Sequence, residues 1–242
     1  MEWIVDVLTN MHWAAVGQII MIDILLGGDN AVVIALACRN LPKNQRFKGV
    51  FWGTAGAIAL RVVLITFAVM LLNLPFLKLV GGALLLWIGY KLVLPDDGEE
   101  EEVEGNTKLL GAIKTIIVAD LIMSIDNVIA IAGAAQQAHE AHQTMLVIFG
   151  LLVSVPFIVC GSQIILKFLD RFPVIVLLGG ALLGWIAGGL FVTDGFVAEQ
   201  FPAIADYHTP VSLACAALVL VAGIIARKRT TTAPAKKLEE KS

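Results

Sequence analysis

Several carboxylate and amide side chains lie inside stretches of the sequence that are otherwise apolar. They occur in two copies of the pattern D-x5-D-N, whose polar members are Asp23, Asp29, Asn30, Asp120, Asp126 and Asn127. A carboxylate at the centre of a bilayer costs about 2.5–3.5 kcal/mol, so these acids need a favourable interaction that offsets this cost. Acids that only cap a broken helix or pair within the bundle would not explain why both copies place them at the same two positions. Oxygen ligands without His or Cys suit Mn²⁺, Ca²⁺ or Mg²⁺ and bind copper or zinc poorly. The pattern therefore predicts a divalent-cation site and leaves these three ions open.

The spacing within each copy also predicts a local irregularity in the backbone. On a straight helix, six residues separate Asp23 from Asp29 by about 9 Å and turn them to different faces, so they could not easily share one ion. Gly27 and Gly28 immediately precede Asp29, and we expect the helix to unwind there. The second copy has Ser124 and Ile125 at this place, which makes a break less expected.

Arg61 is a basic residue deep within an apolar run. Two roles are open to it. It forms a structural ion pair with a buried aspartate, or it acts as a counter-ion that occupies the acidic site when the metal has left.

The elements that must position these residues are membrane-spanning helices. The 242 residues are 58% hydrophobic and 15% charged, and a water-soluble domain could not bury that much apolar surface. The net charge of −3 gives no indication of nucleic-acid binding. Apolar runs long enough to cross a bilayer fall at residues 13–38, 50–72, 74–94, 109–135, 145–168, 172–192 and 209–226. The sequence thus predicts an all-α membrane protein of seven transmembrane helices.

Basic residues are segregated to one side of this arrangement. With the N-terminus outside, one side holds Arg39, Lys43, Arg46, Lys48, Lys91, Lys108, Lys114, Lys167, Arg171, Arg227, Lys228 and Arg229. The opposite loops hold mainly acids: Glu2, Asp6, Glu140, Asp194, Glu199 and Asp206. The positive-inside rule predicts an external N-terminus and a cytoplasmic C-terminus.

The two D-x5-D-N segments belong to a longer internal repeat. A proline followed by Gly-Gly-Ala-Leu-Leu and Trp-Ile begins at Pro75 and recurs from Pro173. Each copy holds three spans, an odd number, so the copies must enter the membrane from opposite sides, as in secondary transporters. We therefore predict repeat 1 at residues 1–94, an acidic cytoplasmic linker at 95–108, repeat 2 at 109–192, an outer loop and seventh helix at 193–226, and a disordered cytoplasmic tail at 227–242.

At its two D-x5-D-N segments the sequence resembles the TerC family of integral membrane proteins, in particular a short bacterial branch. The similarity runs over nearly the whole chain apart from the acidic linker and the tail. It implies a seven-helix fold related to the LysE superfamily, a place in the bacterial inner membrane, and export of divalent cations, chiefly manganese. The resemblance also implies that the six motif residues form the metal site. Members are further linked to tellurium resistance and to metallation of exported proteins.

Other functions fit the sequence less well. An intramembrane aspartyl protease would need G-x-G-D, and Leu26 stands where the first glycine belongs. A maturation factor for membrane proteins or exoenzymes and a Ca²⁺/H⁺ exchanger are the alternatives that stay open. We expect a transporter that is not an enzyme and holds no prosthetic group, with the lipid bilayer, a divalent cation and, as a coupling ion, protons as its partners.

Overall fold

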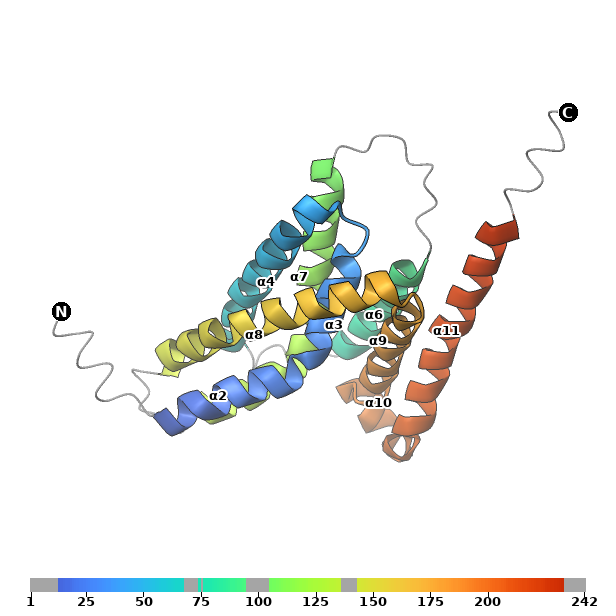
Figure 1. Cartoon of the computed structure of the whole chain (residues 1–242). Helices are drawn as coiled ribbons and strands as arrows, with labels where there is room; N and C mark the ends of the chain where they lie inside the picture. Colours follow the sequence, from blue (N-terminus) through green and yellow to red (C-terminus); the bar gives the residue numbers. More distant parts are fainter. Residues whose placement is uncertain (1–12, 68–73, 75, 95–104, 136–142, 233–242) are drawn as a thin grey trace, which may run out of the picture.

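The structure is a computed structural model that describes residues 13–67, 74, 76–94, 105–135 and 143–232. Regular secondary structure in these residues is helical throughout, which confirms the predicted all-α class for the described part of the chain. In chain order the helices are α2 (Trp13–Leu26), α3 (Gly28–Cys38), α4 (Lys43–Thr66), α6 (Leu77–Val93), α7 (Gly105–Ala135), α8 (Gln143–Arg171), α9 (Val174–Val192), α10 (Gly195–Gln200), the 3-10 helix η2 (Pro202–Tyr207) and α11 (His208–Thr232) (Figure 1).

Four of the described helices are long and apolar enough to cross a membrane. These segments are Lys43–Ile65, Val147–Arg171, Val174–Val192 and His208–Ala226. The bent pair α2 and α3 adds a fifth span if it is counted as one. The predicted third span contains α6, whose 17 residues rise only about 26 Å, and the predicted fourth lies within α7, which carries several charged residues. The chain is thus a multi-span helical membrane protein, and the number of seven spans stays a prediction.

Helices α4, α7 and α11 extend beyond their apolar runs by four or more residues at one end. Helix α4 begins at Lys43 instead of residue 50, α7 begins at Gly105 inside the predicted linker, and α11 continues to Thr232, six residues into the predicted tail. Hydropathy marks the length of a span, whereas lysine and arginine are good helix formers that prolong a helix beyond the apolar core. Residues 95–104 and 233–242, the rest of the linker and tail, lie outside the described residues.

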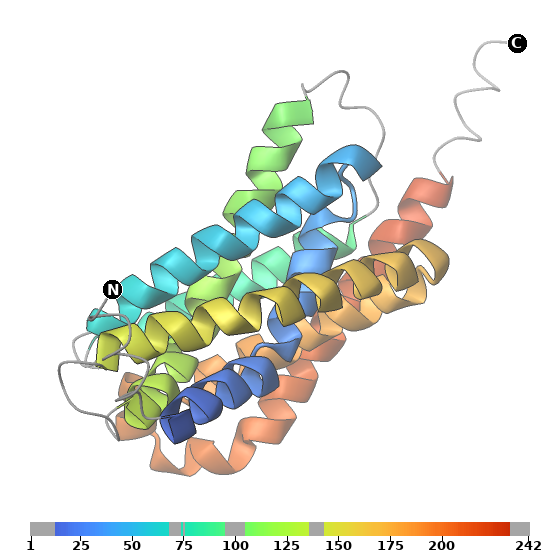
Figure 2. The ribbon, with the colours of Figure 1, turned by 60° about the vertical axis from the view of Figure 1, so that its left-hand side comes forward.

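Helices of the first half of the chain pack mainly against helices of the second half. Helix α4 of the first half packs along α7 of the second, and α2 and α3 pack along α8. Helix α6 packs on α9, the helix at the corresponding place in the second half, and α11 packs mainly on α9 at the side away from α4 (Figures 1 and 2). At Gly188 of α9 a side chain would lie 2.5 Å from the Cα of Ser212 of α11, so only glycine allows this approach.

The first span is broken where the glycine pair predicted it. Helix α2 ends at Leu26 and α3 starts at Gly28, and the two segments are bent by 50° (Figure 1). Helix α7 runs through Ser124 and Ile125 without interruption, in line with the weaker signal in the second copy. A Cβ atom at Gly27 would lie 2.2 Å from the Asp23 carbonyl oxygen, whereas one at Gly28 would meet nothing within 4 Å.

This difference gives a matched pair of substitutions. Gly27→Ala should distort the last turn of α2 and lower the thermal unfolding temperature of the purified protein, because the clash is with the Asp23 backbone carbonyl, which cannot rotate away. Gly28→Ala should be tolerated. Thermal unfolding in detergent measures both. Equal stability of the two variants would mean that Gly27 does not set the break.

Candidate cation site

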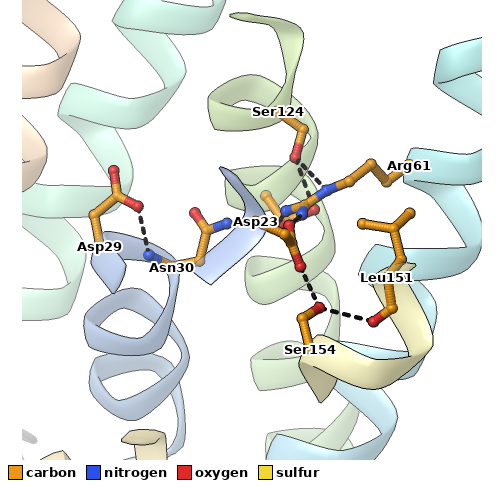
Figure 3. A network of polar contacts seen from close by, with 8 residues as sticks. Asp23, Asp29, Asn30, Arg61, Ser124, Leu151 and Ser154 are labelled. Atoms are coloured by element: carbon orange, nitrogen blue, oxygen red, sulfur yellow. Dashed lines mark hydrogen bonds and ion pairs between the residues drawn. The ribbon is translucent and has the colours of Figure 1, made fainter. Parts of the chain in front are cut away.

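A buried ionic cluster joins the first aspartates of the two sequence motifs. The guanidinium of Arg61, on α4, pairs with Asp23 of α2 (Figure 3) and with Asp120 of α7. Its Nη1 donates to Asp23 Oδ1, and its Nη2 donates to Asp120 Oδ1 at 2.6 Å. Asp23 and Arg61 are each 1% exposed and Asp120 is 7% exposed. The Arg61 guanidinium therefore bridges the equivalent aspartates of the two halves.

Two serines complete this cluster. The Ser124 hydroxyl accepts a hydrogen bond from Arg61 Nε at 3.0 Å and donates one to Asp120 Oδ2 at 3.0 Å. Ser154, on α8, lies against Asp23 Oδ2 and the Leu151 carbonyl, and its single proton can go to one of them at a time. Both serines are fully buried. In the sequence Ser124 stood out only as a substitute for glycine, and Ser154 was missed, although a hydroxyl within an apolar run was an available signal.

Asn30 lies beside the cluster without joining it. Its side chain is 2% exposed, and its amide points toward Asp23 (Figure 3). Neither the Oδ1 nor the Nδ2 atom has a hydrogen-bond partner among the described residues. Buried amides are nearly always hydrogen-bonded, because an orphan polar atom costs about 1–3 kcal/mol. The amide nitrogen faces Asp23 and the amide oxygen points away from it (Figure 3), and an amide oxygen is a ligand that a hard cation uses.

The second acid of each motif lies apart from the ion pair. Asp29 is in the first turn of α3 and is partly buried, and its Oδ1 accepts the Asn30 backbone N–H at 2.8 Å. It points away from Asp23 (Figure 3) but lies within electrostatic range of Asp120 and Arg61. Asp126 and Asn127 are on α7. The Asp126 side chain lies outside the described residues, and Asn127 is partly buried.

The structure thus brings together part of the predicted ligand set. Within the described part of the chain, no three His, Cys, Asp or Glu side chains converge closely enough to hold a metal ion. What converges is two carboxylates, two hydroxyls and a guanidinium, which leaves one excess negative charge. Asp23 is in the last turn of α2, where the negative end of the helix dipole adds to this charge. The predicted six-residue metal site stays a prediction.

The ionic cluster differs in chemistry from another buried acid, Asp194. That carboxylate is 1% exposed and accepts backbone N–H groups from Lys78 at 3.1 Å, Leu79 at 3.3 Å and Phe196 at 3.1 Å. It caps the starts of α6 and α10, which accounts for its burial by helix capping. Asp194 is therefore a structural residue that ties α6 to the turn after α9.

Known proteins resemble this chain over most of its length. It is 41% identical over 206 residues to "Uncharacterized membrane protein YjbE" of Bacillus subtilis (strain 168), which covers 85% of this chain and 92% of that protein. It is 28% identical over 225 residues to "UPF0053 inner membrane protein YgdQ" of Escherichia coli (strain K12), covering 86% and 87%. No solved structure matches. Residues 8–233 match the family described as "Integral membrane protein TerC family". The chain belongs to the TerC family of integral membrane proteins.

Proposed function

We propose that this chain is a divalent-cation transporter of the bacterial inner membrane, and that it exports manganese. The observation that supports this most is the meeting of Asp23 and Asp120, which hold equivalent positions in the two halves, around one buried positive charge. Two carboxylates from different halves that bind a guanidinium also have the charge to bind a transported cation. They lie at the interface of the two halves, where such a cation would cross the membrane.

The broken first span supports the same proposal. Secondary transporters place their ion sites at discontinuous helices near the interface of two repeats. Here the last turn of α2 carries Asp23, and α3 begins two residues after α2 ends. The packing of α4 on α7 corresponds to the packing of α8 on α2 and α3, and this correspondence fits two inverted repeats of three spans each, with α11 as an added seventh span. In this proposal the N-terminus is outside and the C-terminus is cytoplasmic, as the basic residues indicate.

The ligand chemistry favours a hard cation. Carboxylate and hydroxyl oxygens form the cluster, and the unpaired Asn30 amide beside it could supply an amide oxygen. Among Mn²⁺, Ca²⁺ and Mg²⁺, the resemblance to TerC proteins favours Mn²⁺. Protease activity is disfavoured, because an aspartyl dyad shares a proton between two acids, whereas a guanidinium lies between these two. The proposal therefore makes the chain a carrier and not an enzyme.

Cellular manganese content tests this proposal. Cells lacking the protein should accumulate manganese and grow poorly when it is abundant, while their zinc and copper tolerance stays unchanged. Expression of the intact chain should restore both properties. A chain that acts only as a maturation factor should leave total manganese equal in the two strains, and that result would contradict export.

A further inference from the structure

The position of Arg61 bears on how a cation could enter the site. Its guanidinium contacts one oxygen of Asp23 and one of Asp120, and its Nε contacts Ser124. These are the two carboxylates that both halves contribute to the centre of the cluster. A cation can coordinate the same oxygens only after the guanidinium has moved away, since both are positive and need the same space.

The sequence repeat places this positive charge in one half only. Gly53 and Gly150 open the matching second spans, and in that register the counterpart of Arg61 is Ile158. Ile158 is 7% exposed and packs in the hydrophobic core. The two matching aspartates therefore pair with a single arginine. The repeat is symmetric in its acids but not in this positive charge.

The chemistry of arginine suits a tethered substitute for the cargo. A guanidinium stays protonated in any protein environment and its planar fork reaches two carboxylates at once. Two buried carboxylates without a cation would be strongly unfavourable in the low dielectric of a membrane protein. A positive charge that is fixed to α4 can balance one of the two carboxylate charges each time the cargo leaves, and it cannot be lost to solvent.

We propose that Arg61 is a built-in competitor of the transported cation. It occupies Asp23 and Asp120 whenever the cation does not, and it must be displaced before the cation binds. Two consequences follow. The guanidinium lowers the apparent affinity for the cation, because only the fraction of molecules with the arginine displaced can bind. It also balances one of the two carboxylate charges while the unloaded carrier returns across the membrane. This inference rests on the proposed function.

Binding of Mn²⁺ to the purified full chain in lipid nanodiscs tests the first consequence. Arg61→Gln removes the competitor, so the apparent Kd for Mn²⁺ should fall by at least about tenfold. Arg61→Lys keeps the charge but loses the planar guanidinium, so its apparent Kd should lie between those of the wild type and Arg61→Gln. Arg171→Gln, an exposed arginine at the end of α8, is the matched control and should bind like the wild type. Mn²⁺ should also raise the unfolding temperature of Arg61→Gln more than that of the wild type.

Transport by the same proteins in liposomes tests the second consequence. In Mn²⁺/Mn²⁺ exchange the carrier crosses the membrane with Mn²⁺ bound in both directions, so the exchange rate should be retained in Arg61→Gln. Net flux requires the carrier to return without Mn²⁺, so the net flux of Arg61→Gln should fall by at least about tenfold. A purely structural arginine predicts weaker or unchanged binding and an equal loss of exchange and net flux. Either result would overturn the competitor role.

The outcomes separate this inference from the proposed function. If the wild type binds no divalent cation, the proposed function fails and the inference fails with it. If the wild type binds Mn²⁺ but neither Arg61→Gln nor Arg61→Lys binds it more tightly, only the inference fails. If Arg61→Gln does not fold, the affinity of Arg61→Lys decides, and an unchanged Kd in that variant would contradict the proposal.

Discussion

Replacing Asp120 with asparagine should abolish manganese export while the protein still folds and inserts. The substitution keeps the shape of the side chain and removes one ligand charge. It also leaves Arg61 paired with Asp23, so the remaining ion pair is neutral and the buried cluster loses its excess negative charge. Folding should therefore be preserved or improved, because an unbalanced buried charge is unfavourable. Loss of a carboxylate ligand should weaken cation binding at least about tenfold.

Asp23→Asn should behave in the same way, since Asp23 holds the matching position in the first half. Rescue of growth at high manganese, in cells lacking the chromosomal copy, measures both variants, with membrane levels determined by immunoblot. Asp206→Asn changes an exposed acid of η2 and is the control that should rescue fully. Full rescue by both cluster variants would rule out these acids as ligands of the cargo.

Asn30→Ala should separate function from stability. The Asn30 amide is buried and unpaired within the described residues, so its removal takes away no hydrogen bond that they make and should lower the free energy of unfolding by no more than about 1 kcal/mol. If its oxygen ligates the cation during transport, Mn²⁺ flux should fall at least about tenfold.

Thr54→Val is the matched control for Asn30→Ala. The Thr54 hydroxyl is also buried and unpaired in the described part of the chain, but it lies outside both D-x5-D-N motifs. Valine keeps the shape of threonine, and flux should be retained. Paired measurements of flux and unfolding on both variants decide the matter. If flux is normal in Asn30→Ala, the amide is not a ligand.

The sequence carried a strong signal for the helices and for the acids. Carboxylates inside apolar runs are rare enough to be noticed, and their recurrence at Asp23 and Asp120 indicated that two halves meet at one site. The break at Gly27 was predictable as well, because sharp bends in helices concentrate at glycine pairs and this pair directly precedes an intramembrane acid.

The partners of these acids could not be read from the sequence. The sequence left two roles open for Arg61, an ion pair with a buried aspartate or a counter-ion of the acidic site. Its contact with two aspartates depends on how α2, α4 and α7 cross in space. Ser154 reaches Asp23 from a helix 131 residues further along the chain, and no local pattern indicates such a contact. The ends of α4 and α11 were misjudged because hydropathy measures apolar length and not helix length.

Manganese flux into liposomes that contain only the purified chain tests the central claim most directly. Vesicles with the wild-type chain should move Mn²⁺ down its gradient faster than protein-free vesicles, and vesicles with a chain carrying both Asp23→Asn and Asp120→Asn should not exceed the protein-free rate. The double variant leaves Arg61 without its acid partners, so its fold is checked by gel filtration before reconstitution. Flux of the wild type equal to that of protein-free vesicles, or equal flux of the wild type and a folded double variant, would contradict cation transport through the Asp23–Asp120 site.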